Sequence, residues 1–295
     1  MLSQSDTQTF EDVRPRLLGL AYRILGSLTD AEDAVQETFL KWANVDREAI
    51  VSPPAWLTTA CTRQCLDVLR GAHRSRVDYV GTWLPEPIQM AIQDASDADL
   101  DLATSLKTAF LLLLQRLTPR ERAAYLLHEI FELPYRDVAA TLDVSEPACR
   151  KLVSRAKDNI DSTRTRFRVP IQRQDELLAA FETAIKSGTT GHLTPLLADD
   201  IRLVADGGGK VPAILDTLRG VESVTEFLSV RLHDYWDDHA WNVVDMNGER
   251  GVVIRDGDEV VAAVTFAYAD SGKVTHIYIV RNPDKLTKLM AQPLH

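Results

Sequence analysis

A short basic segment is the part of the sequence whose residue types and spacing most clearly predict chemistry. It reads SEPACRKLVSRAK and covers residues 145–157. At 100° per residue its small and apolar residues fall on one side of a helix, whereas Arg150, Lys151, Ser154 and Arg155 fall on the other. Arginine can bind a guanine edge through two hydrogen bonds, and lysine more often contacts phosphate. The pattern predicts either a helix that reads nucleic acid or a basic stripe that faces solvent.

The preceding residues favour the nucleic-acid interpretation. The segment YRDVAATL predicts a short helix, and the tight sequence DVS separates it from the basic helix. Ser145 can cap the second helix, and Pro147 is tolerated because first-turn amides lack partners within a helix. Two helices joined by a tight turn, with an apolar seam and a basic outer side, form a helix-turn-helix pattern.

The distribution of charge permits a nucleic-acid partner, although the formal net charge of the chain is -10. Residues 1–170 contain 21 Lys and Arg against 24 Asp and Glu, and the remaining residues contain 12 against 19. Residues 61–76 contain four basic residues and one acidic residue, and residues 145–168 contain seven and three. Two local patches are therefore basic, while acidic residues gather in DAEDAVQE and QDASDADLD.

The composition is that of a globular protein. The chain has 295 residues, 45% of them hydrophobic and 26% charged, a length that favours more than one domain. Cys61, Cys65 and Cys149 indicate a reducing compartment, and no nearby His or further Cys completes a metal site. Neither a signal peptide nor a membrane-spanning apolar run is recognisable. These features predict a cytoplasmic protein without a metal, cofactor or membrane partner.

Helical spacing predicts that the first part of the chain is all-α. A helix opening at TDAE would have Thr29 as N-cap and Glu32 as its capping-box partner. After the loop VDREAIVSPP, a helix with a basic far end follows from Trp56. In LTPRERAAYLLHEIF, Thr118 and Glu121 form a second capping box. Between these helical blocks, two prolines in WLPEP and an acidic run predict a linker.

After Pro170 the pattern changes to that of an α+β domain. DELLAAFETAIKSG, HLTPLLADD and ESVTEFLSVRL predict three helices. The segments IRLVAD, AWNVVDM, RGVVIRD, EVVAAVTFAYA and KVTHIYIV predict a meander of strands, with hairpin turns at Asp256-Gly257 and Ser271-Gly272.

Two separated blocks resemble a bacterial sigma factor of the extracytoplasmic-function type, group IV. LLGLAYRILGSLTDAEDAVQETFLKWA resembles conserved region 2, and LTPRERAAYLLHEIFELPYRDVAATLDVSEPACRKLVSRAK resembles region 4. WLPEP, DGGGK and NPDKL resemble the motifs of the subgroup that carries a C-terminal SnoaL-like domain. The resemblance implies two all-α sigma domains followed by an α+β, NTF2-like, cone-shaped domain. The expected domains are 8–77 (region 2), 78–101 (acidic linker with WLPEP), 102–168 (region 4), 171–286 (SnoaL-like regulatory domain) and 287–295 (tail).

The resemblance also implies partners. Core RNA polymerase would be contacted through the clamp helices of its β′ subunit and through its β flap, and an acidic helix face suits such a basic partner. The polymerase-binding residues would be Asp30, Asp33, Gln36 and Glu37.

Promoter DNA would be read at two elements. A loop and helix in region 2 would melt and read the -10 element, capturing a flipped base and holding the backbone. Trp56 belongs to this set, although its place beside Leu57 also fits a core position. The -10 residues would be Asn44, Trp56, Arg63, Arg70, Arg74 and Arg76, and the -35 residues would be Ser145, Arg150, Lys151, Ser154 and Arg155.

The C-terminal domain would modulate activity in cis. By resemblance, the DGGGK loop and NPDKL lie toward the sigma domains, and the acidic linker runs through polymerase channels. These regulatory residues are Asp206, Gly207, Gly208, Gly209, Lys210, Asn282, Pro283, Asp284, Lys285 and Leu286. The sequence leaves open whether the cup of this domain binds an unknown small ligand. We expect the protein to be a monomer when it is free of polymerase.

Two other classes of function remain as alternatives. SnoaL-like folds include isomerases and cyclases, and five residues of this domain could act as acid or base. No motif places a carboxylate and a partner residue at a spacing that is typical of a catalytic pair, so we expect no enzyme activity. A helix-turn-helix repressor with a ligand pocket would instead need a dimer and a palindromic site. The candidate acid–base residues are His192, Asp206, His233, His239 and His276.

Overall fold

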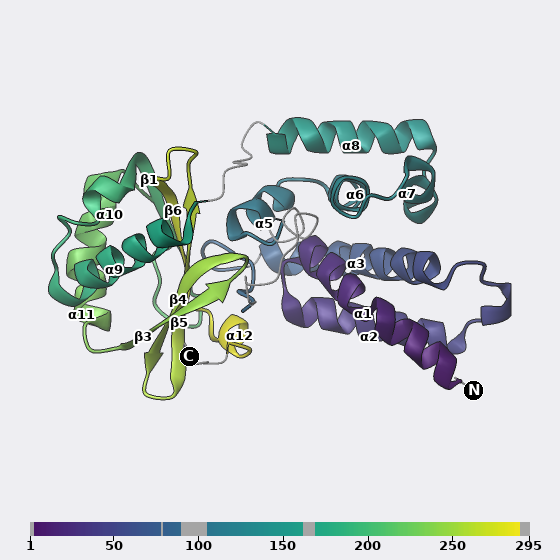
Figure 1. Cartoon of the computed structure of the whole chain (residues 1–295), viewed down its shortest axis with the longest axis horizontal. Coiled ribbons are helices and arrows are strands. Elements are labelled where there is room, and N and C mark those ends of the chain that lie inside the picture. Colours follow the sequence, from purple (N-terminus) through teal and green to yellow (C-terminus); the bar gives the residue numbers. More distant parts are fainter. Residues whose placement is uncertain (1–2, 78, 90–104, 162–168, 290–295) are drawn as a thin grey trace. The chain divides into compact units, whose positions relative to one another are not determined.

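The computed structural model describes residues 3–77, 79–89, 105–161 and 169–289, with the side chains of 72–77 and 161 left out (Figure 1). The chain forms two compact units, and each combines two separate stretches of sequence. The helical unit contains residues 1–78 and 110–163, and the sheet unit contains residues 79–109 and 164–295. The sheet unit therefore includes the WLPEP segment and the residues just before the second helical block.

The helical unit confirms an all-α first part. Helix α1 packs against α2 and α3, and α3 also contacts α6 and α7, which in turn pack against α8. Large buried side chains from both blocks, including Trp42, Leu57 and Tyr125, form its core. None of the described helices is long and apolar enough to cross a membrane. The helices are α1 (Gln4–Leu25), α2 (Leu28–Asn44), α3 (Pro53–Val77), α5 (Thr108–Gln115), α6 (Pro119–Tyr125) with a π-helical turn at Leu126–Ile130, α7 (Tyr135–Leu142) and α8 (Glu146–Asp161), and a 3-10 turn lies at Arg47–Ala49.

The two predicted capping boxes have different outcomes. At α6, Thr118 accepts from the amide of Glu121, and the Glu121 carboxylate accepts from the amide of Thr118, as predicted. At α2, the prediction was wrong because the N-cap is Ser27, whose hydroxyl accepts from the amide of Asp30 at 3.1 Å. Gly26 ends α1 with φ +74°, so the chain reverses at once and Ser27 is already the extended residue that an N-cap requires.

The sheet unit confirms the α+β class. Its six strands have the order β2-β1-β6-β5-β4-β3, and β1 is parallel to β6 whereas every other neighbouring pair is antiparallel. Four of the five predicted strands, β3 to β6, form a meander with glycines at positive φ in the predicted turns, whereas IRLVAD lies in β1, which is outside the meander and pairs in parallel with β6. The strands are β1 (Leu197–Asp206), β2 (Leu218–Arg219), β3 (Ala240–Met246), β4 (Glu249–Asp256), β5 (Glu259–Tyr268) and β6 (Val274–Val280), and the helices are α9 (Ile171–Ser187), α10 (Val221–Glu226) with a π-helical turn at Phe227–Leu232, α11 (His233–Trp236) and α12 (Pro283–Leu286).

The helix predicted for HLTPLLADD is wrong. Only a 3-10 turn forms at Thr194–Leu196, and β1 begins directly afterwards at Leu197. Leu197 and Ile201 both enter the core, because side chains four residues apart share one face of an extended strand, and the same spacing also fits one side of a helix. Apolar spacing alone therefore does not distinguish helix from strand here, and the register of β1 against β6 is irregular between Leu197 and Arg202.

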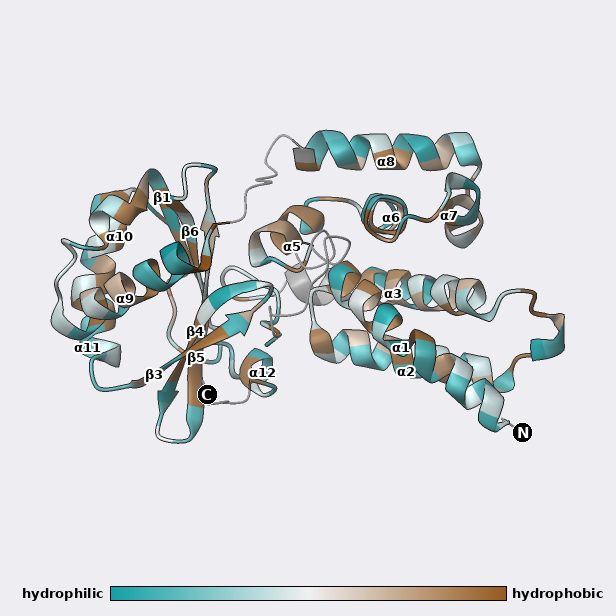
Figure 2. Cartoon of the chain, in the orientation of Figure 1, coloured by the Kyte–Doolittle hydropathy of each residue, from teal (hydrophilic) through white to brown (hydrophobic). Residues whose placement is uncertain are grey.

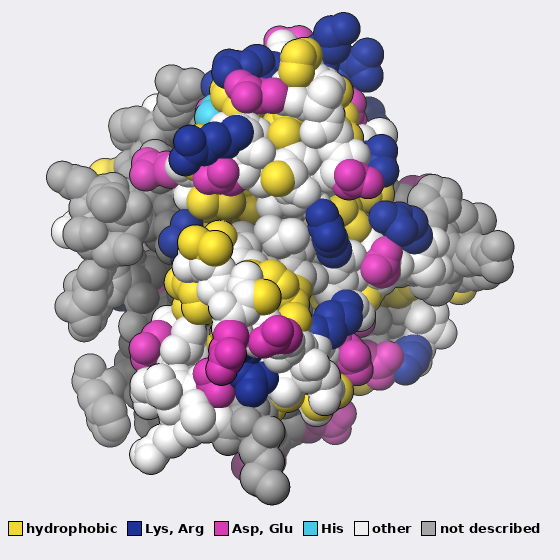
Figure 3. Space-filling view, turned by 90° about the vertical axis from the view of Figure 1, so that its right-hand side faces the viewer, with side chains coloured by type: hydrophobic (Ala, Val, Ile, Leu, Met, Phe, Trp, Pro, Cys, Tyr) yellow, Lys and Arg dark blue, Asp and Glu magenta, His cyan; other side chains and the backbone are white. Residues whose placement is uncertain are grey.

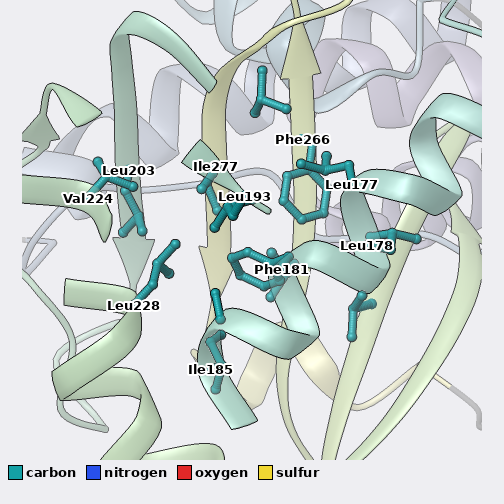
Figure 4. Packing of buried hydrophobic residues seen from close by; sticks show 14 of the residues in the cluster. Leu177, Leu178, Phe181, Ile185, Leu193, Leu203, Val224, Leu228, Phe266 and Ile277 are labelled. Carbon is teal, nitrogen blue, oxygen red and sulfur yellow. The ribbon is translucent and has the colours of Figure 1, made fainter. Parts of the chain in front are cut away.

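An apolar core fills the space between α9 and one face of the sheet (Figure 4). Phe181 of α9 packs edge-on against Phe266 of β5 at 5.3 Å between ring centroids, with Leu203 and Ile277 from the neighbouring strands in the same cluster. Figure 2 shows the hydropathy of the elements. The central strands of the sheet are brown, that is hydrophobic, along much of their length, whereas α8 of the helical unit is mostly teal, that is hydrophilic.

Candidate nucleic-acid interface and linker clamp

Helices α7 and α8 form the predicted helix-turn-helix. Asp143 ends α7 with φ +55°, and Ser145 accepts from the amide of Ala148 at 3.4 Å at the start of α8. Cys149 and Val153 are buried on the side of α8 that packs on α6 and α7. The opposite side is exposed, and Figure 3 shows Lys and Arg side chains gathering at the top of the molecule, the height of α8 in Figure 1. All five proposed -35 residues are exposed: Ser145, Arg150, Lys151, Ser154 and Arg155.

Arg150 is held in place more firmly than its exposure implies. Its Nη2 donates to the Glu146 carboxylate at 2.6 Å, and its guanidinium carbon lies 4.2 Å from the centroid of the Tyr135 ring. The side chain is nevertheless 58% exposed, so most of its donors remain accessible.

The proposed -10 residues do not form one free surface in the helical unit. Arg63 donates to the carbonyl oxygens of Ala140 and Thr141 in α7, at 3.0 and 2.9 Å. Arg70 pairs with Asp67 at 2.8 Å.

The remaining -10 residues have mixed environments. Trp56 is half-buried with its ring 5.7 Å from that of Trp42, and Asn44 is exposed and donates to the carbonyl of Leu40 at 2.8 Å. Arg74 and Arg76 lie outside the residues whose side chains are described.

Direct contacts join the two helical blocks. The hydroxyls of Thr59 in α3 and Thr141 in α7 lie 2.9 Å apart. Arg122 of α6 is buried and donates to the carbonyl oxygens of Leu114 and Ile24, the latter at the end of α1. A buried guanidinium that satisfies two carbonyls is costly to remove, because those acceptors would lose their partners. The blocks therefore pack as one body in this unit.

The proposed polymerase-binding residues share one side of α2. Asp33, Gln36 and Glu37 are exposed, and Asp30 is half-buried. Leu40 continues this side and is 47% exposed.

In the sheet unit, the buried carboxylate of Asp206 binds the WLPEP segment. Asp206 ends β1 with no exposed surface, and it accepts from the Tyr79 hydroxyl at 2.5 Å and from the Leu84 amide at 2.8 Å. Lys285 of α12 donates to the same carboxylate at 2.7 Å and to the Leu84 carbonyl at 2.6 Å. Its ammonium also lies 4.1 Å from the Trp83 ring centroid. We call this set the linker clamp.

The Tyr79 hydroxyl of the linker clamp stays protonated. Burial and the hydrogen bond to Asp206 raise the pKa of the Tyr79 hydroxyl far above its usual value, so Tyr79 stays a donor. A buried carboxylate that pairs with an ammonium and accepts further hydrogen bonds is compensated in the way that such a buried charge requires.

The glycine loop and the start of α12 complete the linker clamp. The Gly208 amide donates to Asp206 at 3.0 Å, and Gly208 has φ +62° with no room for a Cβ beside the Asn282 amide. Asn282 donates to the Tyr79 hydroxyl at 2.9 Å and accepts from the Asp284 amide as the N-cap of α12. At the rim, the exposed Lys210 and Asp284 form an ion pair.

The other members of the two motifs surround the clamp. Gly207 and Leu286 are buried, whereas Gly209 and Pro283 are exposed. A Cβ on Gly209 would meet Val80 at 3.0 Å, so this glycine lies directly against the linker segment.

A second attachment of the same segment was missed by sequence reasoning. The Asn247 backbone amide donates to the Ile88 carbonyl at 2.9 Å, and its side chain accepts from the Ile88 amide and donates to the Leu106 carbonyl. Lys107 pairs with Glu249 at 2.7 Å. The dipeptide Asn247-Gly248, both residues at positive φ, carried a hairpin signal in the sequence. Residues 78 and 90–101 of the predicted linker and residues 102–104 of the predicted region 4 lie outside the described residues.

The candidate acid–base residues do not converge on one another. Asp206 belongs to the linker clamp, and His233 lies 2.7 Å from the Ile185 carbonyl. His276 stacks on Tyr278 at 5.5 Å, and His239 pairs with the adjacent Asp238. His192 is exposed. Among the described residues, no group of three or more His, Cys, Asp or Glu could hold a metal ion.

Comparison with known proteins agrees with this arrangement. Residues 9–75 match the Sigma-70 region 2 family, and residues 107–160 match Sigma-70, region 4. The chain is 34% identical over 293 residues to the ECF RNA polymerase sigma factor SigJ of Mycobacterium tuberculosis, covering 96% of this chain and 93% of the relative. The chain belongs to the ECF family of RNA polymerase sigma factors.

The likeness of this sigma factor to its relatives extends through the sheet unit. The crystal structure of Mycobacterium tuberculosis SigJ superposes with a TM-score of 0.74 at 32% sequence identity, covering 95% of this chain and 98% of that chain. A probable ECF sigma factor SigI of the same species is 29% identical over 284 residues, covering 95% of this chain and 94% of the relative. The α+β region of this sigma factor corresponds to a SnoaL-like domain.

Proposed function

We propose that this ECF sigma factor directs core RNA polymerase to specific promoters and that its C-terminal domain modulates initiation in cis. The observation that carries the proposal is the exposed basic side of α8, presented by a helix-turn-helix within the region 4 match. The chain itself would carry out no catalysis, which fits the dispersion of its His and Asp residues. Its partners would be core RNA polymerase and promoter DNA.

The two proposed DNA-reading parts must separate before both can act. By their names, the -10 and -35 elements lie about 25 base pairs apart, which is roughly 85 Å of B-form DNA at about 3.4 Å per base pair. In the helical unit, α3 and α7 are in direct contact. Arg63 of α3 donates hydrogen bonds to two carbonyl oxygens of α7, so these donors are not available to DNA in this arrangement. We infer that the packed unit is a closed form, in which the two DNA-reading parts would not reach both elements at once. Binding to polymerase would open it.

The linker clamp supports control in cis. Residues 79–89 follow region 2, residues 105–108 precede region 4, and both stretches are attached to the sheet unit. When region 2 moves away from region 4, the segment that joins them would have to move with respect to the sheet unit or detach from it. The C-terminal domain holds both ends of the segment between region 2 and region 4. It can thereby influence the opening of the helical unit without contacting polymerase.

A gel shift tests the proposal against its rivals. Labelled DNA from the region upstream of this gene is mixed with the full chain, with core polymerase, or with both. We expect a specific shifted complex only when both proteins are present. A specific complex formed by the chain alone on a palindromic site would instead establish a conventional repressor.

A further inference from the structure

The ring of Tyr135, the first residue of α7, lies between two other side chains. Its centroid is 3.8 Å from that of the His128 ring, at an interplanar angle of 31°. On the Arg150 side, the guanidinium carbon lies 4.2 Å from the same centroid. His128 is itself fixed, because its Nδ1 lies 2.8 Å from the Leu133 carbonyl. Tyr135 therefore provides Arg150 with a supported aromatic surface.

Two constraints act on the Arg150 guanidinium at once. Its carbon lies 4.2 Å from the centroid of the Tyr135 ring, and its Nη2 donates to Glu146, one helical turn earlier. An arginine side chain loses considerable rotamer entropy when it binds, and less when it is already ordered. The guanidinium has five N–H donors, and the bond to Glu146 uses only one of its edges. Arg150 can thus bind a further acceptor pair without first becoming ordered.

The other cations of the -35 set are not constrained in this way. Lys151 and Arg155 are exposed on α8, and within the described part of the chain neither side chain forms an ion pair or a cation–π contact. Mobile, solvated cations suit phosphate oxygens, whose recognition needs charge rather than a fixed direction. Arg150 therefore has a constrained side chain, whereas Lys151 and Arg155 do not.

We propose that Tyr135 is a positioning residue that orients Arg150 toward a guanine edge in the -35 element, while Lys151 and Arg155 contact phosphates. This inference rests on the proposed promoter-reading role of α8. Tyr135 acts through Arg150. Its contribution is then confined to the one base position that Arg150 reads.

The test measures base discrimination by the full chain with core polymerase. Initiation is measured on promoters that carry each of the four bases at each position of the -35 element. Arg150→Ala should lower discrimination at one position by about 5- to 150-fold. Tyr135→Leu should lower it at that same position by roughly two- to five-fold. Tyr135→Phe keeps the aromatic face and should match the wild type.

Further variants and a stability measurement separate positioning from folding. Tyr135→Leu combined with Arg150→Ala should discriminate no worse than Arg150→Ala alone, because the positioned group is gone. Tyr135→Met is measured in parallel, since its flexible side chain can fill the space if leucine disturbs folding. Thermal unfolding of each variant is recorded with the same protein.

Two results would overturn the inference. In the first, both Tyr135→Leu and Tyr135→Met leave discrimination unchanged while Arg150→Ala abolishes it, so Tyr135 positions nothing. In the second, the Tyr135 variants weaken all promoters equally and in step with their loss of thermal stability, which is a purely structural effect. If Arg150→Ala itself leaves discrimination unchanged at every position, the proposed reading role of α8 fails together with the inference.

Discussion

Asp206 shows how one buried carboxylate can hold together segments that lie far apart in the sequence. Its carboxylate is reached by the Tyr79 hydroxyl, the Leu84 and Gly208 amides and the Lys285 ammonium, so two sequence motifs and the linker meet on one side chain. Removing a partner from such a buried pair leaves a charge uncompensated, at a cost of several kcal/mol. The attachment of the linker is therefore strong but depends on few residues.

Gly208→Ala should weaken the linker clamp. The new Cβ would collide with the Asn282 amide, in addition to the cost of φ +62° for a residue with a side chain. We expect the free energy of unfolding to fall by about 2 kcal/mol more than in Gly257→Ala. Gly257 is a matched control because it has φ +56° and open space around its Cβ.

Limited proteolysis shows where the effect of Gly208→Ala lies. Chymotrypsin should cleave after Tyr79 or Trp83 faster in this variant than in Gly257→Ala, since cleavage of a folded chain follows local opening. Equal cleavage and equal stability of the two variants would show that the glycine loop does not hold the linker.

The sequence allows some residue-scale predictions and not others. The exposure of Arg150 and Lys151 follows from helical periodicity, because the apolar side of α8 has to face α6 and α7. The partners of Asp206 could not be derived in this way. Tyr79 and Lys285 lie 127 and 79 residues away, and no local pattern encodes such contacts.

At the scale of elements, the contact between α3 and α7 determines whether the helical unit is closed. The Thr59 and Thr141 hydroxyls lie 2.9 Å apart, and Arg63 bonds to the C-terminal carbonyls of α7 next to them. Basic groups at a helix C-terminus are favourably placed with respect to its dipole. This contact joins region 2 to the helix that supports α8.

A disulfide between Thr59→Cys and Thr141→Cys should lock the closed form. The close approach of the two side chains is within reach of disulfide geometry. We expect the oxidised double variant to lose at least about ten-fold in run-off transcription, because the locked unit cannot span both promoter elements. A reductant should restore the activity.

The wild type and the two single cysteine variants, treated with the same oxidant, are the controls for this lock. The native Cys61, Cys65 and Cys149 are buried and should not respond. Full initiation by the crosslinked double variant would show that opening is not required.

Local signals predicted most elements, and long-range pairing explains the failures. Turn residues with positive φ at Gly257 and Gly272 end strands where the sequence places them. The segment HLTPLLADD has apolar residues at helical spacing, yet its second half is a strand because β6, about 80 residues later, pairs with it. That parallel pairing has no local signature.

At the scale of the whole molecule, the chain passes three times between its two units, after residues 78, 109 and 163. The order of region 2, linker, region 4 and SnoaL-like domain is readable from motifs, because each motif is local. The inclusion of residues 79–109 in the sheet unit is not readable, since it depends on side chains such as Asn247 and Lys285 that lie far along the chain.

This organisation affects how truncation experiments are interpreted. A version ending at Arg168 would lose the surface that buries Leu84, Pro85 and Pro87, and would expose an apolar linker. A change in its activity would combine the loss of regulation with that exposure. Point variants in the linker clamp, made in the full chain, separate the two effects.

Run-off transcription with purified core polymerase and the full chain tests the central claim most directly. The template is the region upstream of this gene, and the polymerase is assayed with and without the chain. We expect a transcript with one defined start that forms only when the chain is present. Absence of any such transcript, together with no binding of the chain to core polymerase, would contradict the account.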